Sequence, residues 1–324
     1  MSTKKIVKRS TTKLPNVAKP AFKRIGFLGL GIMGSAMAGN LMEAGFEVYG
    51  FDPTAKARQH FKAAGGKVSK DASDLARSVQ VVITSLPNAA ALIDTANVLA
   101  CEGSKGLLVI ETSTLDIKDK EAARSVMAAK GVVLLDCPLS GTGAQAARKD
   151  LTVYASGPSA DIRRLAPVFE GFSKAHFDLG AFGNGMKMKL MANLLVAIHN
   201  VSTAEALLLG QRWGISPSTA VKVLSDGAGG SRMLQVRGPM MENEGWKDAT
   251  MKVSVWQKDM KLIAQALADT QVPAPLFTAT IPLYNAAMGM GHEGNDTAAV
   301  FDVLERMSSQ PKKSTAKKTT SRKR

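Results

Sequence analysis

Cysteine is nearly absent from this chain of 324 residues, which contains only two. Cys101 and Cys137 lie far apart, and neither belongs to a Cys-x-x-Cys pair, so the sequence predicts no disulfide framework and no zinc site. The four histidines also lack the spacing of metal ligands, and we expect no metal centre. Two reduced, buried thiols are typical of a protein in a reducing compartment.

Long apolar runs are missing too. The longest have the length of a β-strand, and glycine or charge interrupts them well short of the ~20 residues that a membrane span needs. Residues 1–24 contain no apolar stretch of the secretory kind. We therefore expect a soluble, cytoplasmic protein without membrane contact. The mitochondrial matrix is the alternative, because residues 1–24 are basic, rich in hydroxyl groups and free of acid, as transit peptides are.

Acidic residues are absent from both ends of the chain. Residues 1–24 contain eight lysines or arginines and residues 308–324 contain seven, which together equal the net charge of +15. The rest of the chain is therefore formally neutral. Segments of this composition bury too little apolar surface to become ordered, so we expect disordered basic tails at 1–23 and 308–324. Weak, salt-dependent contact with nucleic acid is the alternative role for these tails.

The length of the chain predicts two domains, because single cores seldom grow this large. Strand-like and helix-like segments alternate up to residue 183, with strands expected at 24–30, 47–51, 81–86, 107–110, 132–135 and 150–157. This alternation predicts the α/β class, with a doubly wound parallel sheet over residues 24–183. The pattern from 184 to 307 predicts an all-helical C-terminal domain, with helix starts or loops at Pro217, Pro239, Pro273, Pro275 and Pro282.

A glycine-rich segment follows the first predicted strand and opens the first predicted helix. In the Gly-x-Gly-x-x-Gly turn of a Rossmann domain, the first glycine permits the tight turn and the second lets the backbone approach a pyrophosphate. The third lets the helix pack close to the strand, and the helix N-terminus then attracts the phosphates. We therefore predict a Rossmann domain that binds a nicotinamide dinucleotide at residues 29–34, through Gly29, Gly31, Ile32, Met33 and Gly34.

Asp52, at the end of the second predicted strand, bears on the choice of cofactor. It lies 21 residues after Gly31, where a carboxylate accepts hydrogen bonds from the adenine ribose and repels the 2′-phosphate of NADP. Lys56 and Arg58 follow closely and partly compensate this charge. We expect NAD as the cofactor, with NADP as the alternative.

Four segments resemble one known family. Their sequences are GFLGLGIMGSAMAGNLMEAG at 26–45, DCPLSGTGAQA at 136–146, GNGMKMKLMAN at 183–193 and KDM at 258–260. The resemblance covers about residues 25–305 and is to the β-hydroxyacid dehydrogenase family, which includes 3-hydroxyisobutyrate dehydrogenase and tartronate semialdehyde reductase. It implies an NAD(P)-dependent oxidoreductase that interconverts a small β-hydroxy acid and its semialdehyde or keto acid by hydride transfer.

The third segment contains two lysines, and the resemblance implies that Lys189, not Lys187, is the catalytic acid/base. Asn193 follows four residues later, so the two side chains share one helix face and can address one substrate. A lysine can exchange the hydroxyl proton if burial and neighbouring positive charge lower its pKa toward the working pH. Asn193 would orient the substrate or the lysine by hydrogen bonding.

The resemblance also implies the other contacts of the site. The substrate carboxylate would be held by Ser140, Gly141 and Thr142, and the cofactor would also contact Leu86, Pro87, Thr114 and Lys258. Two residues depart from the family pattern. Thr142 stands where the family usually has a second glycine, and Ala192 stands where many members have another asparagine. The first of these departures, Thr142, leaves the identity of the substrate open.

Several functions remain open on the sequence alone. The alternatives to a β-hydroxy-acid dehydrogenase are a sugar-acid dehydrogenase of the threonate or aldonate type and an imine-reducing relative, although imine reducers commonly replace the catalytic lysine. A non-enzymatic alternative is a DNA-associated scaffold that uses the basic tails. The resemblance further implies a homodimer or homotetramer, for which the apolar surface at residues 196–209 is a candidate.

Overall fold

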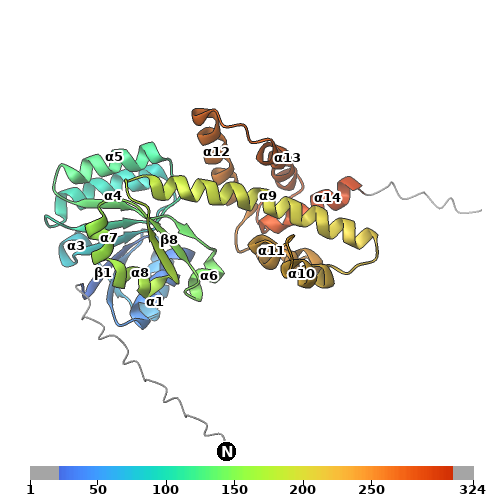
Figure 1. The fold of residues 1–324 in the computed structure, drawn as a ribbon. Coiled ribbons are helices and arrows are strands. Elements are labelled where there is room, and N and C mark those ends of the chain that lie inside the picture. Colours follow the sequence, from blue (N-terminus) through green and yellow to red (C-terminus); the bar gives the residue numbers. More distant parts are fainter. Residues whose placement is uncertain (1–21, 309–324) are drawn as a thin grey trace, which may run out of the picture.

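The structure, a computed structural model, describes residues 22–308. The tails predicted at 1–23 and 308–324 therefore lie almost entirely outside the described residues. Their inner boundaries need correction, because Phe22 is buried in the first hydrophobic core and Ser308 ends the last helix. The described part of the chain begins and ends at opposite ends of the molecule (Figure 1).

The first domain is built on a parallel sheet, as predicted. Of its six strands, the one at residues 67–68 was not expected, and the strand expected at 150–157 belongs to a second, smaller sheet. The strand order of the large sheet, β3-β2-β1-β4-β5-β6, is that of a dinucleotide-binding Rossmann sheet. The central strands β4 and β5 read as continuous apolar runs because both faces of the sheet are covered there, whereas β3, at the edge, is exposed. The bounds of the six strands are β1 Arg24–Leu28, β2 Glu47–Phe51, β3 Lys67–Val68, β4 Val81–Thr84, β5 Leu108–Glu111 and β6 Val133–Asp136.

Two hydrophobic cores flank this sheet. Alternation along β1 sends Phe27 into the core that contains α1 and α2, and Leu28 into the core that contains α3, α4 and α5. The connections between successive strands thus lie on both faces, which is the doubly wound arrangement that we predicted. The helices are α1 Ile32–Glu43, α2 Ala55–Ala63, α3 Ala72–Ser78, α4 Ala89–Glu102 and α5 Ile117–Ala128.

A small mixed sheet completes the first domain and was not predicted. It comprises β7 (Leu139–Ser140), β8 (Thr152–Ala155) and β9 (Ala175–Asp178), with β7 antiparallel and β9 parallel to β8. The short helix α6 (Gly143–Ala147) joins β7 to β8. Two short helices lie between β8 and β9, α7 (Ser159–Arg164) and α8 (Ala166–Phe172), and they are separate because Pro167 cannot continue a helix and begins a new one.

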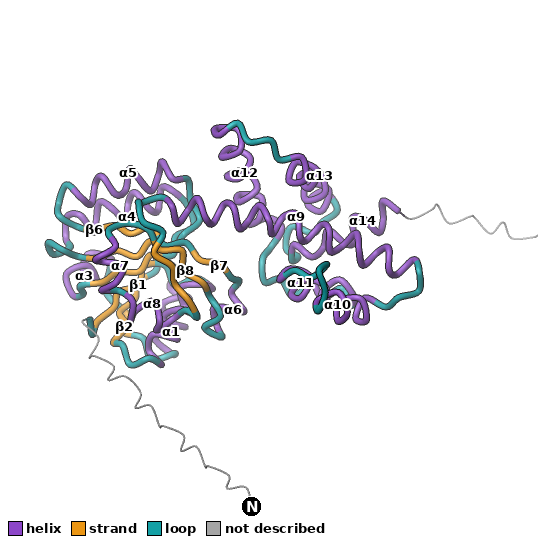
Figure 2. Tube along the Cα trace, viewed as in Figure 1, coloured by secondary structure: helices purple, strands orange, loops and turns teal. Residues whose placement is uncertain are grey.

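The second domain is helical, as predicted, and all nine strands of residues 22–308 lie in the first (Figure 2). Pro217 and Pro275 begin helices, but the expectation for Pro239 and Pro282 was wrong, since both lie inside one. Tertiary packing of these buried helices outweighs the hydrogen bond that proline removes. The helices are α9 Asn184–Arg212, α10 Pro217–Ser225, α11 Arg232–Glu242, α12 Val253–Thr270, α13 Pro275–Gly289 and α14 Val300–Ser308, with 3-10 turns η1 Gly245–Lys247 and η2 Thr297–Ala299.

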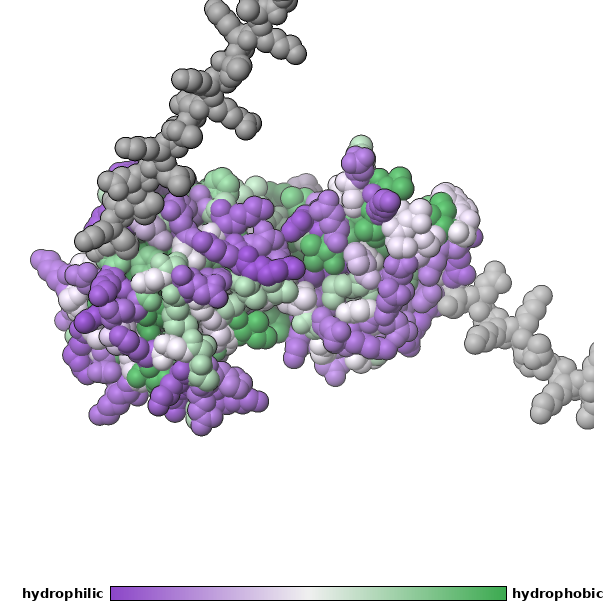
Figure 3. Space-filling view, turned by 90° about the horizontal axis from the view of Figure 1, so that it is seen from below, coloured by the Kyte–Doolittle hydropathy of each residue, from purple (hydrophilic) through white to green (hydrophobic). Residues whose placement is uncertain are grey.

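Helix α9 belongs to both domains. It starts against β8 and β6 and then runs through the middle of the helical domain, with α12 and α13 on one side and α10 and α11 on the other (Figure 1). By length and composition alone α9 could also cross a membrane, which the short apolar runs of the sequence did not predict. Its buried residues include Lys189, Asn193 and Asn200, and it contacts five other helices, so we interpret it as the core helix of the second domain. Hydrophobic side chains also gather on the surface where the two domains meet (Figure 3).

Candidate active site

The glycine turn after β1 has the geometry that a pyrophosphate site requires. Gly29 has a φ of +93°, and a Cβ added there would lie 2.2 Å from the carbonyl oxygen of Ser85. A Cβ added at Gly34 would lie 2.0 Å from the carbonyl oxygen of Gly29, whereas one at Gly31 would meet nothing within 4 Å. Within the described chain, the N–H groups of Ile32, Met33 and Gly34 make no hydrogen bond and are available to an anion.

Asp52 joins this turn to the end of β2. Its carboxylate accepts hydrogen bonds from the backbone N–H groups of Leu30 and Thr54, both at 2.8 Å. The predicted compensating residue Arg58 turns toward the backbone, because its Nη1 donates to the carbonyl oxygens of Asp52 (2.6 Å) and Pro53 (2.9 Å). The Arg58 guanidinium also lies over the Phe51 ring, 5.6 Å from its centroid. The Asp52 carboxylate thus lies beside the glycine turn.

A cleft of about 290 Å³ lies between the two domains and brings together residues from distant parts of the sequence. The first domain contributes the glycine turn, the ends of β4 and β5, and the loop at residues 139–143, which contains the predicted substrate contacts and is called the substrate loop below. The second domain contributes α9, α12 and a loop at 249–252. Predicted site residues that line it are Ile32, Met33, Leu86, Thr114, Gly141, Thr142 and Lys189. Ser140, Pro87 and Lys258 lie next to lining residues in the sequence but outside the lining itself.

Lys189 reaches this cleft from one turn inside α9. Its side chain is 8% exposed, and within residues 22–308 its ammonium makes no hydrogen bond and no ion pair. Burial lowers the pKa of Lys189 and the nearby Lys258 lowers it further, while Asp259 opposes them; the net direction is down. Lys187, the other lysine of the segment, is exposed and donates to Asn184 Oδ1 at 3.3 Å. Of these two lysines, only Lys189 is therefore available to a substrate in the cleft.

Asp259 lines the cleft together with Lys189, whereas Asn193 lies outside the lining and contacts Asp259. Asn193 Nδ2 donates to Asp259 Oδ2 at 3.0 Å, and both residues are buried. The other carboxylate oxygen of Asp259 has no hydrogen-bond partner among the described residues, and burial raises the pKa of this side chain. Sequence reasoning missed Asp259, although its position after Lys258 in the fourth segment was a signal. The direct partner of Asn193 is thus a carboxylate, which holds its amide in place.

Lys258 connects the two domains at the cofactor side of the cleft. Its Nζ donates to the carbonyl oxygen of Thr114 at 2.6 Å, across 144 residues of sequence. A second contact, between Arg232 of α11 and Asp150 at 3.1 Å, joins the domains near the substrate loop. These contacts hold the cleft between the domains together.

The substrate loop shows why Thr142 can replace the usual glycine. Gly141 has a φ of +136°, which only glycine adopts readily, but Thr142 has a φ of −104°. Thr142 starts the short helix α6, and its N–H donates to Gln145 Oε1 at 3.1 Å. The departure therefore adds a hydroxyl and a methyl group to the cleft without straining the backbone.

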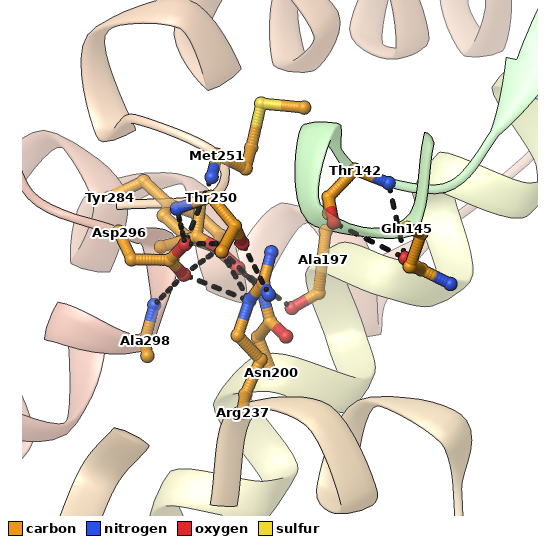
Figure 4. Close-up of polar contacts among 11 residues, drawn as sticks. Thr142, Gln145, Ala197, Asn200, Arg237, Thr250, Met251, Tyr284, Asp296 and Ala298 are labelled. Carbon is orange, nitrogen blue, oxygen red and sulfur yellow. Dashed lines mark hydrogen bonds and ion pairs between the residues drawn. The ribbon is translucent and has the colours of Figure 1, made fainter. Parts of the chain in front are cut away.

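The opposite wall of the cleft is the loop at residues 249–252, which a buried network holds (Figure 4). Asp296 Oδ2 accepts hydrogen bonds from the N–H groups of Thr250 (2.8 Å) and Met251 (2.9 Å). Arg237 pairs with Asp296 Oδ1 at 2.9 Å, and its Nη1 donates to Thr250 Oγ1 at 3.1 Å. Because Arg237 and Asp296 are buried, water screens this ion pair little. No sequence signal marked this loop.

Comparisons with known proteins identify the family of the chain. The profile of the NAD binding domain of 6-phosphogluconate dehydrogenase matches residues 24–206, more than half of the chain. A second profile, described as NAD-binding of NADP-dependent 3-hydroxyisobutyrate dehydrogenase, matches residues 183–304. The chain is 32% identical to L-threonate dehydrogenase of Cupriavidus necator over 87% of its own length and 96% of that protein.

Further relatives share the same extent of similarity. NAD-dependent L-serine dehydrogenase of Pseudomonas aeruginosa is 29% identical over 87% of this chain and 98% of its own. The crystallised Mycobacterium tuberculosis 3-hydroxyisobutyrate dehydrogenase with L-serine superposes with a TM-score of 0.79 at 29% identity, over 87% of this chain and 99% of that one. The resemblance seen in the sequence is thus confirmed. The chain belongs to the β-hydroxyacid dehydrogenase family and is an NAD(P)-dependent oxidoreductase.

Proposed function

We propose that the chain oxidises a small β-hydroxy acid, and reduces the matching semialdehyde or keto acid, with Lys189 as the acid/base. The observation that carries this proposal is a buried lysine without a partner that lines a cleft shared by the glycine turn and the substrate loop. A buried amine of lowered pKa is neutral more often than an exposed one and can accept a proton.

The residues of the cleft divide the reaction between them. Ser140, Gly141 and Thr142 hold the substrate carboxylate with hydroxyl and N–H groups. A dinucleotide held through its pyrophosphate by the glycine turn would supply a nicotinamide as the acceptor for the hydride of the alcohol carbon. Lys189 Nζ takes the hydroxyl proton as the C=O bond forms, and it returns that proton in the reverse direction. Asn193 holds the Asp259 carboxylate by a hydrogen bond, and Asp259 balances the charge of the protonated lysine.

A panel of substrates tests this function. The purified chain is supplied with NAD or NADP and, in separate assays, 3-hydroxyisobutyrate, glycerate, 3-hydroxypropionate, L-threonate or L-serine, and the nicotinamide absorbance is followed. We expect turnover of at least one β-hydroxy acid. Turnover of L-threonate alone would favour the sugar-acid alternative, which the Cupriavidus necator relative supports. Turnover of none of them would contradict the proposal.

We further infer that NAD is preferred over NADP because of Asp52. The Asp52→Ala variant loses the negative charge beside the adenine ribose, so we expect the ratio of kcat/KM for NAD to that for NADP to fall by about tenfold, which corresponds to ~1.4 kcal/mol. The control is Asp71→Ala, which removes an acid at the N-terminus of α3 in the same domain. An unchanged ratio in Asp52→Ala would refute the ribose role of this carboxylate.

We also propose that the helical domain forms a homodimer or homotetramer. Support comes from apolar side chains that α9 leaves in water, since Met191, Leu195 and Leu209 are each half exposed or more. Apolar surface of this kind commonly marks an interface between proteins. Sedimentation of the purified chain at micromolar concentration is expected to give a dimer or a larger species, and a monomer would contradict the proposal.

The basic ends support a second candidate function, contact with nucleic acid. They carry the whole net charge of the chain, and most of their residues lie outside the described part. Removing residues 1–21 and 309–324 is expected to abolish retention on DNA at low salt while kcat stays unchanged, because phosphate contacts weaken steeply with salt. If the full chain is not retained on DNA at low salt, the proposal fails.

A further inference from the structure

Three charged side chains are completely buried behind the cleft, where the first domain meets α9. They are Glu111 at the end of β5, Lys120 in α5 and Asp136 at the end of β6, and each is 0% exposed. Lys120 Nζ lies 2.6 Å from Glu111 Oε2 and 2.7 Å from Asp136 Oδ1. The function proposed above gives none of the three a role. Buried charges cost free energy, so a group of three requires an explanation.

One end of this triad holds the loops on the cofactor side of the cleft. Glu111 Oε1 accepts a hydrogen bond from the N–H of Ser113 at 2.9 Å. Ser113 Oγ in turn accepts one from the N–H of Leu86 at 2.8 Å. Ser113 and Leu86 both line the cleft, and Leu86 is a predicted cofactor contact. Glu111 therefore fixes the ends of β4 and β5 relative to each other.

The other end holds the start of α9. Asp136 Oδ2 accepts hydrogen bonds from the N–H of Met186 at 2.8 Å and from Ser156 Oγ at 3.1 Å. Ser156 Oγ accepts from the N–H of Gly185 at 2.9 Å. A carboxylate suits this position because the first N–H groups of a helix lack partners and carry positive charge. The contact is also close, since a Cβ added at Gly185 would lie 2.3 Å from the carbonyl oxygen of Tyr154.

Lys120 is the only cation in direct contact with the two carboxylates among the described residues. Burial alone would lower the pKa of Lys120, but Glu111 and Asp136 outweigh that effect and hold the pKa above its usual value, so the side chain is charged. Without this charge, two carboxylates would face each other in a dry site. They would repel each other or share a proton, and the start of α9 would lose its fixed distance from β5.

We propose that Lys120 is a positioning residue of the dehydrogenase reaction: it joins Glu111 to Asp136 and so fixes Lys189, one turn into α9, against the cofactor side of the cleft. The inference rests on the role proposed for Lys189. The triad acts on Lys189 through geometry, because the charges that shift the pKa of Lys189 are those of Asp259 and Lys258 and not those of the triad.

The test compares Lys120→Met with Lys118→Met, which alters an exposed lysine of the same helix. Hydrogen exchange of residues 183–190 reports the docking of α9 without any substrate. We expect exchange there to accelerate about tenfold or more in Lys120→Met only. With a hydroxy acid from the panel, we expect kcat to fall by about 10–100-fold while KM changes less than about threefold, because a small misplacement of a reacting group has effects of that size.

The pH dependence of kcat distinguishes an ionic role of Lys120 from a role in packing alone. In Lys120→Met, one carboxyl of the Glu111–Asp136 pair gains a raised pKa, and protonation lets it donate a hydrogen bond to the other. The ratio of kcat in Lys120→Met to kcat in Lys118→Met should therefore fall as pH rises through that pKa. The remaining titratable group there, the Cys137 thiol, stays neutral because burial holds its pKa well above its usual value. A ratio independent of pH would overturn the proposal.

A double variant keeps the proposal testable if Lys120→Met does not fold. Glu111→Gln with Lys120→Met leaves one carboxylate and an amide that can donate to it, and the net charge of the group stays at one negative charge. We expect slow exchange at residues 183–190 and recovered kcat, with no new pH dependence. Fast exchange in the folded double variant, or equal exchange in Lys120→Met and Lys118→Met, would overturn the inference. Normal turnover of Lys189→Ala would instead remove the proposed function.

Discussion

Replacement of Lys189 by alanine is expected to lower kcat by about 10²–10⁴-fold, the usual contribution of a positioned acid/base. The amine lines the cleft, has no partner among residues 22–308 and is the group best able to exchange the hydroxyl proton. Affinity for NADH, measured by fluorescence titration, should change little, because Lys189 does not belong to the glycine turn. The matched control is Lys187→Ala, two residues away and exposed, which should retain near-normal turnover. Equal activity in the two variants would reject the assignment.

The pH profile of the wild-type chain gives an independent check on Lys189. Oxidation requires the neutral amine and reduction requires the ammonium. Oxidation should therefore rise, and reduction fall, as pH increases through a pKa that burial holds below the usual lysine value. Asp259 opposes this shift, so Asp259→Asn should move the rising limb of oxidation to lower pH. If the rising limb does not move in Asp259→Asn, the group that titrates is not Lys189.

A methyl group added at Gly34 is expected to weaken cofactor binding strongly. The new Cβ would lie 2.0 Å from the carbonyl oxygen of Gly29, which cannot move away, since Gly29 itself packs against the backbone of Ser85. Overpacking of this kind costs about 1–3 kcal/mol or more, and each ~1.4 kcal/mol lost from binding raises the Kd tenfold. We therefore expect the Kd for NADH to rise by about 10–100-fold in Gly34→Ala, together with a lower Tm.

Helix α1 offers a control for this variant. Gly39 lies in the same helix, and a Cβ added there would meet nothing within 4 Å. Gly39→Ala should bind NADH normally and be more stable by about 0.4–1 kcal/mol, because alanine reduces the freedom of the unfolded chain. If both variants bind NADH equally well, close packing at Gly34 is not what builds the site.

Local patterns in the sequence predicted the parts of the fold that depend on local physics. The strands at the centre of the large sheet were found because burial on both faces makes each an apolar run, as in β4 and β5, whereas the short, exposed edge strand β3 was missed. The relation between Lys189 and Asn193 was found because it is a property of one helix. The glycine turn was found because its residues and Asp52 have a fixed spacing in the sequence.

Residues whose role depends on long-range contacts were not found. Lys120 lies in a helix with other charged residues, and its pattern is that of a solvated side chain, yet it is completely buried. Its partners come from the ends of two separate strands, which no local pattern connects. Arg237 and Asp296 are 59 positions apart and meet only in the folded helical domain. The prolines inside α11 and α13 have the same explanation, since packing with distant helices decides their conformation.

The docking of α9 on the first domain also divides the enzyme into parts that can change separately. Lys189 is one turn from the hydrogen bonds that tie α9 to Asp136 and Ser156, so it moves with the Rossmann domain. The loop at residues 249–252 is tied instead to Asp296, far from that joint. Substitutions in this loop can therefore alter which acid fits the cleft while the reacting groups keep their alignment. Within one family, the range of substrates can therefore change by drift or by design through this loop, which takes no part in the chemical step.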